Sequence, residues 1–156
     1  MPMNVWLNIH IKGTGETPQM IAEILKKEHR LHQAFLACGA DAAILARSAV
    51  PEILICNMDR QESNWDYIAE TIKMDADFIQ LRGKILPEFT NLSKILKENG
   101  IRINYYGTDS PDDIKRLFEL GVDFPLVNDI NNSIETAKNL GLDIAKPIFR
   151  SEKAPN

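Results

Sequence analysis

A short phrase that occurs three times in the second half of the chain constrains its fold more than any other feature. In each copy a glycine ends a helical stretch and an apolar segment follows at once. The copies are Asn99-Gly100-Ile101, Leu120-Gly121-Val122 and Leu140-Gly141-Leu142. The glycines recur at about 20 residues, which is the length of one strand plus one helix. The sequence therefore predicts repeated βα units, and such repeats form a parallel sheet.

The same alternation is predicted along the whole chain. Strands are expected over 5–12, 34–38, 53–57, 78–81, 101–106 and 124–127, with a helix after each of them. Thr17, Ser63 and Ser110 are predicted to cap three of these helices. In the helix after Ser63, an apolar stripe that begins at Trp65 and ends at Ile72 is expected to face the core.

Two parallel architectures compete: an open doubly wound sheet and a TIM-type barrel. Strands of a doubly wound sheet are covered on both faces and read as continuous apolar runs. Here the first strand places Asn8, His10 and Lys12 on one face, and the fifth strand alternates in the same way. Polar residues toward the carboxyl end of a strand suit the interior of a barrel. We therefore predict an α/β fold that forms an incomplete TIM-type barrel over 1–141, followed by a tail over 142–156.

The bulk properties exclude several classes of protein. The net charge is −4 and no basic stripe is present, so nucleic acid is not expected as a partner. No apolar run is long enough to cross a bilayer, and the first residues do not form a secretory signal. We expect a cytoplasmic protein, unless the chain is part of a longer secreted one. Cys38 and Cys56 are expected to be free, buried thiols.

Three segments in this order resemble glycerophosphodiester phosphodiesterases. They are Leu7-Asn8-Ile9-His10-Ile11-Lys12, the element 34–51, and the stretch from Ile101 to Asp129 with Leu120-Gly121-Val122-Asp123 inside it. The family reads apolar-Asn-Ile-Glu-x-Lys on its third strand, and Trp-Thr-Val-Asn, Leu-Gly-Val-Asp and Thr-Asp-Pro near its end. The resemblance implies strands three to eight of that barrel, which agrees with a count of about six βα units where a closed barrel has eight.

The resemblance also implies which parts are missing. Family members begin with strands that carry His-Arg-Gly and Glu-x-Asp, and nothing in this chain matches them. We therefore expect a phosphodiesterase-like protein, related to phosphoric diester hydrolases of lipid and glycerol metabolism, that is incomplete or inactive as an isolated chain. A Ca²⁺ or Mg²⁺ ion is expected only if the barrel is completed. The alternative is a module that binds a phosphate or another anionic ligand without cleaving it, or that serves only in assembly.

The resemblance and the topology select five candidate site residues, and each also has a structural explanation. His10 replaces the family's metal-binding Glu and is a weak candidate metal ligand, because Ca²⁺ and Mg²⁺ prefer oxygen. Lys12 matches the family's phosphate-contacting lysine, and Arg82 is a second candidate phosphate contact. Tyr106 stands at the family's Trp position, and Asn128 follows the last strand where barrels bind phosphate. Alternatively, His10 and Lys12 serve the interior structurally, Arg82 is solvated, Tyr106 is a core aromatic and Asn128 belongs to a helix cap.

Other acidic and histidine residues are excluded by topology. Asp75 and Asp77 precede a strand and therefore lie at the end of the barrel opposite the expected site. His29 and His32 lie at the end of a helix that enters a strand, and so at that same end.

An incomplete barrel has two open strand edges with unpaired backbone groups, which proteins normally cover. We expect an N-terminal half-barrel partner or self-association into a homo-oligomer through these edges. A small phosphoester is the expected ligand.

Overall fold

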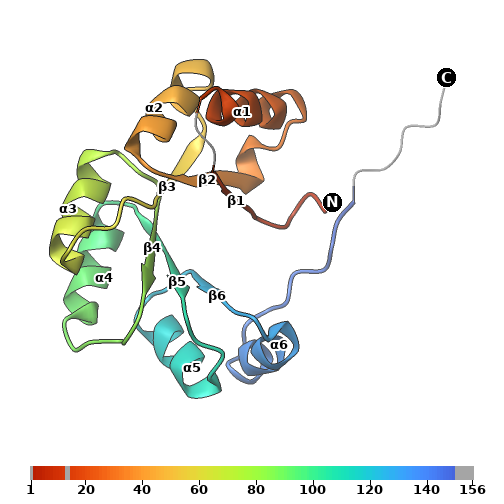
Figure 1. Ribbon diagram of the computed structural model, residues 1–156. Coiled ribbons are helices and arrows are strands. Elements are labelled where there is room, and N and C mark those ends of the chain that lie inside the picture. Colours follow the sequence, from red (N-terminus) through yellow and green to blue (C-terminus); the bar gives the residue numbers. More distant parts are fainter. Residues whose placement is uncertain (1, 13–14, 150–156) are drawn as a thin grey trace.

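The computed structural model describes residues 2–12 and 15–149, which form one curved parallel sheet with helices on its outer side (Figure 1). Its strands are β1 (Leu7–His10), β2 (Ala34–Cys38), β3 (Leu54–Asn57), β4 (Phe78–Arg82), β5 (Arg102–Tyr106) and β6 (Phe124–Leu126). Each strand pairs in parallel with the next one in sequence. The prediction of an incomplete TIM-type barrel is confirmed.

A helix follows each strand. The helices are α1 (Thr17–Lys27), α2 (Ala40–Ala49), α3 (Asn64–Lys73), α4 (Phe89–Glu98), α5 (Pro111–Glu119) and α6 (Ile130–Asn139). The three repeated glycines all have positive φ, at 72° for Gly100, 87° for Gly121 and 75° for Gly141. This left-handed conformation is strained for residues with a Cβ atom, so glycine ends α4, α5 and α6 and turns the chain into the next segment.

The strand residues that face the helices form the main apolar core. Ile79 and Ile103 are in register on β4 and β5, Ile55 of β3 lies on the same face of the sheet, and all three are fully buried. Helix residues such as Leu92 and Leu117 close this layer from outside. Because side chains alternate along a strand, the residues next to these isoleucines on the same strands face the interior of the barrel.

The amino end of the interior is filled by aromatic rings. Phe35 stacks on Phe78 with ring centroids 4.2 Å apart, and Trp6 contacts both of them. Trp6 precedes β1 and Phe124 begins β6, yet their centroids are only 6.0 Å apart. The aromatic cluster therefore draws the first and last strands toward each other at this end, although no β1–β6 strand pairing occurs within the described residues.

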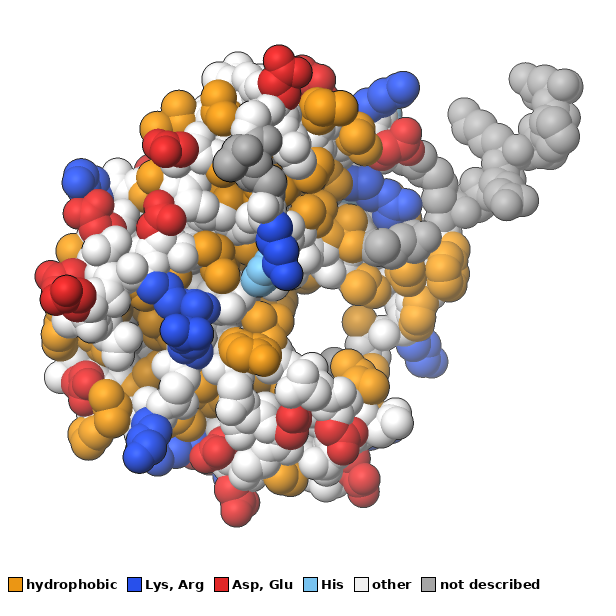
Figure 2. All heavy atoms as spheres, viewed as in Figure 1, with side chains coloured by type: hydrophobic (Ala, Val, Ile, Leu, Met, Phe, Trp, Pro, Cys, Tyr) orange, Lys and Arg blue, Asp and Glu red, His pale blue; other side chains and the backbone are white. Residues whose placement is uncertain are grey.

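The C-terminal segment 142–149 runs back toward the start of the chain (Figure 1). Asn4 Nδ2 donates to the Lys146 carbonyl at 2.7 Å, and the Ile148 N–H donates to Asn4 Oδ1 at 2.9 Å. The Met3 N–H also donates to the Ile148 carbonyl at 2.5 Å. The segment thus contacts the chain just before β1. Figure 2 shows an opening through the molecule on the side where the sheet does not close. The predicted boundary at residue 141 stays a prediction, and residues 150–156 lie outside the described part.

Two local predictions are wrong in whole or in part. Helix α1 has Glu16 at its N-cap without a side-chain bond, so Thr17 begins the helix and does not cap it. The apolar stripe predicted on α3 is confirmed only at Ile68: its other members, Trp65, Ala69 and Ile72, are exposed, and Tyr67 and Thr71 are buried with Ile68 instead. The predicted caps at Ser63 and Ser110 are confirmed, because each hydroxyl accepts a backbone N–H from the first helical turn.

The predictions from bulk properties are confirmed in part. No helix in the described ranges is long and apolar enough to cross a bilayer. Cys38 and Cys56 are free and buried. Burial raises the pKa of the Cys38 thiol to about 11 and that of Cys56 to about 12, so neither is a reactive thiolate at neutral pH.

Candidate functional site

The carboxyl ends of the strands form one rim of the barrel, which we call the mouth. His10 ends β1, Arg82 ends β4 and Tyr106 ends β5, and Lys12 and Asn128 follow β1 and β6 by two residues each. All five side chains are exposed. Since all the strands are parallel, the structure brings the five predicted residues to the same rim. The roles given to them stay predictions.

The loop between β3 and α3 is held by a buried asparagine. Asn57 ends β3 and is 1% exposed. Its Nδ2 donates to Thr71 Oγ1 at 2.9 Å, its Oδ1 accepts the Asp59 N–H at 2.8 Å, and its carbonyl accepts the Tyr67 hydroxyl at 2.5 Å. These bonds fix the start of the loop against α3. The loop thereby carries Arg60 to a defined place at the mouth.

The acidic neighbour of Arg60 is turned away from it. The Asp59 carboxylate accepts the Ala40 N–H at 2.7 Å, at the N-terminus of α2, where negative charge is favoured. A Cβ at position 39 would overlap the Asp59 carboxylate and displace it, so glycine leaves space for this contact. The Asp59 carboxylate thus binds the N-terminus of α2, and no salt bridge joins it to Arg60 in the described part of the chain.

A cleft of about 190 Å³ lies at the mouth between the β3–α3 loop, α3 and the end of β4. Its lining is mostly polar and consists of Arg60, Gln61, Asn64, Tyr67, Gln80, Leu81 and Arg82. Asn64 begins α3, so the positive end of that helix dipole also lies at this cleft. Burial raises the pKa of the Tyr67 hydroxyl, and the nearby Arg60 charge opposes that rise. The Tyr67 hydroxyl is therefore uncharged at neutral pH, and the charged side chains that line the cleft are the arginines.

Below the mouth, the interior carries a layer of amides. Gln80 is 5% exposed and Asn104 is fully buried, and the two are in register on β4 and β5. Asn104 Nδ2 lies 3.8 Å from the Cys56 sulfur. The buried oxygens Asn8 Oδ1, Gln80 Oε1 and Asn104 Oδ1 accept no hydrogen bond from any described residue. This amide layer lies between the mouth and the aromatic end of the barrel.

Asn128 is tied to an aspartate that sequence reasoning missed. Asp109 accepts the Asn128 N–H at 2.6 Å, Asn128 Nδ2 at 3.1 Å and the Asp129 N–H at 3.1 Å. The backbone bond from Asp129 and the bonds from Asn128 lower the pKa of the Asp109 carboxyl. Asp109 therefore joins the loops after β5 and β6. The sequence could have placed Asp109 at the mouth, since it follows the predicted strand 101–106 at the same end as Asn128.

Arg60 was missed as well, although a signal for it existed. It follows β3 by three residues, at the same end of the sheet as Arg82. The topological argument that selected Arg82 also selects Arg60.

The acidic residues at the opposite end have structural roles, as topology predicted. Asp77 Oδ2 accepts the Ile55 N–H at 2.8 Å and pairs with Arg47 at 3.3 Å. Asp123 Oδ2 accepts the Ile103 N–H at 2.7 Å and pairs with Lys97 at 2.5 Å. Each aspartate thus holds the start of the preceding strand.

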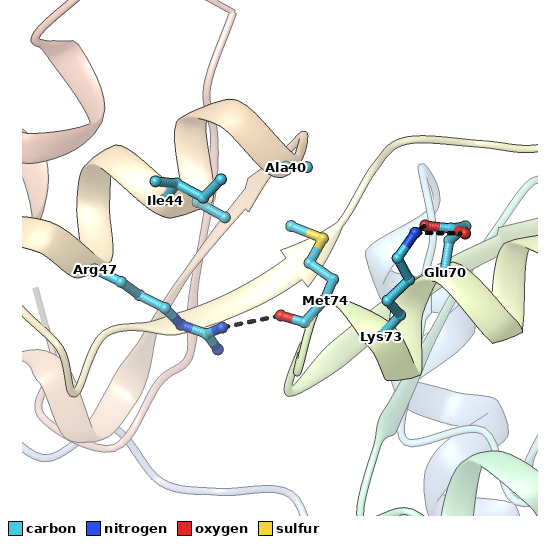
Figure 3. Close-up of a pocket in the computed structure, with 7 residues that line it drawn as sticks. Ala40, Ile44, Arg47, Glu70, Lys73 and Met74 are labelled. Atoms are coloured by element: carbon cyan, nitrogen blue, oxygen red, sulfur yellow. Dashed lines mark hydrogen bonds and ion pairs between the residues drawn. The ribbon is translucent and has the colours of Figure 1, made fainter.

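A larger groove of about 340 Å³ lies between α2 and α3, away from the mouth (Figure 3). Its charged side chains already form hydrogen bonds or ion pairs within the chain. Arg47 donates to the carbonyls of Met74 and Asp75 at 3.1 and 2.6 Å, and Lys73 pairs with Glu70 at 3.1 Å. The groove therefore presents no free set of converging polar groups, and we place the candidate site at the smaller cleft.

The described residues do not suit the divalent cation that the resemblance implies. They contain no group of three His, Cys, Asp or Glu side chains able to hold a metal ion. At the mouth, Asp59 and Asp109 already accept backbone N–H groups, and His10 offers nitrogen where Ca²⁺ and Mg²⁺ prefer oxygen. No chemical step is therefore derived through a metal.

No protein-family model matches the chain, and the comparison with curated proteins finds no relative. Solved structures do resemble it. A glycerophosphodiester phosphodiesterase from Parabacteroides distasonis superposes with a TM-score of 0.66 at 15% identity, over 86% of this chain and 57% of that one. The Bacillus subtilis YkuI protein, which has an EAL domain and was solved with c-di-GMP and calcium, gives a TM-score of 0.54 at 12% identity, over 89% of this chain and 45% of that one.

The chain thus spans about half the length of these structural neighbours. At such identities the likeness shows the fold alone. The resemblance read from the sequence is confirmed at that level: the chain has the fold of part of a phosphodiesterase-type barrel.

Proposed function

We propose that this chain binds a small phosphoester at the mouth of a phosphodiesterase-like partial barrel and that the described residues do not hydrolyse it. One observation carries the proposal. Lys12, Arg60, Arg82 and Lys84 gather toward the mouth, and no carboxylate of the described residues lies within 4.0 Å of their charged nitrogens. Among the described residues away from the mouth, six basic ones form ion pairs, Arg47 and Lys97 among them, and scattered exposed ones such as Lys27 and Arg116 do not.

Unpaired cations beside a concave surface attract anions and raise their local concentration. Arginine also matches phosphate geometrically, because its planar guanidinium donates two parallel hydrogen bonds to phosphate oxygens. Figure 2 shows Lys and Arg side chains beside the hollow on this face. The charge and the shape of the mouth therefore both favour a phosphate group.

The second candidate is a glycerophosphodiester phosphodiesterase completed by a partner, with a role in lipid or glycerol metabolism. Its support is the open sheet, whose edge strands β1 and β6 have room for additional strands, and the partial coverage of an enzyme of that name. An N-terminal half-barrel would supply the missing carboxylates and histidines, whereas a second copy of this chain would supply strands without those motifs. Lys12 would then contact the phosphate, and Ca²⁺, present in the YkuI complex, is a candidate metal.

Two measurements separate these candidates. The first is calorimetric titration of the purified chain with glycerol 3-phosphate in the presence of chelator, where we expect saturable binding. The second is release of glycerol 3-phosphate from glycerophosphocholine with Ca²⁺ or Mg²⁺, where we expect none. Chelator-sensitive release would establish the enzyme instead. Absence of binding to either compound would contradict the proposal and leave an assembly role.

A further inference from the structure

We infer that the phosphate is held between Arg60 and Arg82, and that this cleft selects a phosphate monoester dianion over a diester monoanion. The inference rests on the proposed function and narrows it to one part of the mouth and one class of ligand. It departs from the expectation that Lys12 is the leading phosphate contact.

The first support is the placement of the two arginines on neighbouring strands. Asn57 of β3 is in register with Ile79 of β4, and Arg60 and Arg82 each follow these partners by three residues (60 − 57 and 82 − 79). Both line the same cleft of about 190 Å³. The Asn57 hydrogen bonds hold one wall and strand β4 holds the other, so the two guanidinium groups are carried by fixed backbone.

The second support is the charge that faces the cleft. Lys84 and Arg82 line an adjoining depression that also contains Glu88, yet no salt bridge joins Glu88 to either cation. The Asp66 carboxylate accepts the Ser63 hydroxyl at 2.6 Å. Asp59 is bound to the N-terminus of α2. The two arginines thus keep their charge uncompensated at short range.

Two uncompensated guanidinium groups favour an anion with two charges over an anion with one, since Coulomb attraction scales with the product of the charges. A phosphate monoester carries close to two negative charges at neutral pH because its second pKa is about 6. A diester carries one charge at any pH above its single low pKa. The side chains of Gln61 and Asn64 add neutral hydrogen-bond donors at the same cleft.

The test compares ethyl phosphate with diethyl phosphate by calorimetric titration at pH 8. We expect the wild-type chain to bind ethyl phosphate at least roughly tenfold more tightly. Arg60→Gln and Arg82→Gln should each weaken ethyl phosphate binding by roughly tenfold or more. Arg116→Gln, which alters an exposed arginine of α5, is the control and should change nothing. Circular dichroism verifies that all the variants are folded.

Acidification from pH 8 to pH 5 supplies an independent readout. Ethyl phosphate loses one charge on protonation and should bind more weakly, whereas diethyl phosphate keeps its single charge. Protonation of His10 at the mouth would strengthen both ligands, and protonation of Asp59, Glu62, Asp66 or Glu88 would do the same, so these groups cannot produce the expected loss.

The outcomes are distinguishable. Equal affinity for the two esters overturns the inference. So does binding that survives in Arg60→Gln and Arg82→Gln but is lost in Lys12→Gln, although the proposed function then stands. Failure of the wild-type chain to bind either ester contradicts the proposed function itself.

Discussion

The two ends of the barrel differ in the interactions of their charged side chains, although the same strands lead to both ends. At the amino end, Asp77 and Asp123 pair with Arg47 and Lys97, and the Arg102 guanidinium lies 5.2 Å from the centroid of the Trp6 ring. At the mouth, Arg60 and Arg82 have no carboxylate partner within 4.0 Å among the described residues. The difference indicates that the amino end supplies stability and leaves the mouth available for a ligand.

The largest expected effect comes from removing the centre of the aromatic cluster. Phe78 is fully buried and contacts Phe35, Trp6 and Phe124. Phe78→Ala should lower the free energy of unfolding by ~3–5 kcal/mol, because it loses buried area and leaves a cavity. Urea denaturation measures this, with Phe149→Ala as the control at a position that is 66% exposed. A loss below ~1 kcal/mol would contradict the role given to this end.

A smaller effect is expected at the boundary between the two regions. Asn57→Ala removes the side-chain bonds to Thr71 and Asp59 and leaves buried partners unsatisfied. We expect a loss of ~2 kcal/mol in unfolding free energy. Binding of ethyl phosphate should weaken as well, because the Arg60 loop loses its anchor. Unchanged binding in the folded variant would show that the loop is positioned in another way.

Gly39→Ala tests whether the Asp59 carboxylate stabilises the N-terminus of α2. The added Cβ displaces the Asp59 side chain and breaks its bond to the Ala40 N–H. Loss of this helix cap should cost ~1 kcal/mol, measured by thermal or urea unfolding. Asp59→Asn, which keeps an oxygen acceptor, should cost less. If Gly39→Ala is as stable as the wild type, Asp59 does not hold the helix.

Acid should weaken the contact between the loops that follow β5 and β6. Hydrogen bonds lower the pKa of Asp109 in the folded chain, so the stabilisation they provide is present above its ordinary value of 3.8 and is lost as the pH falls through the lower, folded value. NMR titration of Asp109 and of the Asn128 amide should show both signals changing together below pH 3.8. An Asp109 carboxyl that titrates at or above that pH would refute the link between these loops.

The architecture was predictable from the sequence because the βα repeat depends on features of short segments of the chain. The glycines that end α4, α5 and α6 and the alternation of polar and apolar residues along β1 and β5 do not depend on distant residues. The buried face of α3 was not predictable in this way. Thr71 is buried because its hydroxyl accepts from Asn57 and donates to the Tyr67 carbonyl at 2.6 Å, a tertiary arrangement that hydrophobic periodicity does not record.

The site was predictable in outline only. Topology placed His10, Arg82, Tyr106 and Asn128 at one rim, and the same reasoning applied to the loops after β3 and β5 selects Arg60 and Asp109. The pairing of charges was not accessible from the sequence. That Asp59 binds a helix N-terminus and forms no salt bridge with Arg60 follows only from the packing of the β3–α3 loop against α2.

The most direct test of the account is a backbone amide NMR titration of the isotope-labelled chain with ethyl phosphate. We predict saturable chemical-shift changes confined to residues 57–67, from the end of β3 to the first turn of α3, and to residues 80–84, with none at the aromatic end. Changes centred on Phe35 and Phe78, or on the groove between α2 and α3, would contradict the division of the molecule into a stabilising end and a binding end. Absence of any change would contradict the binding site itself.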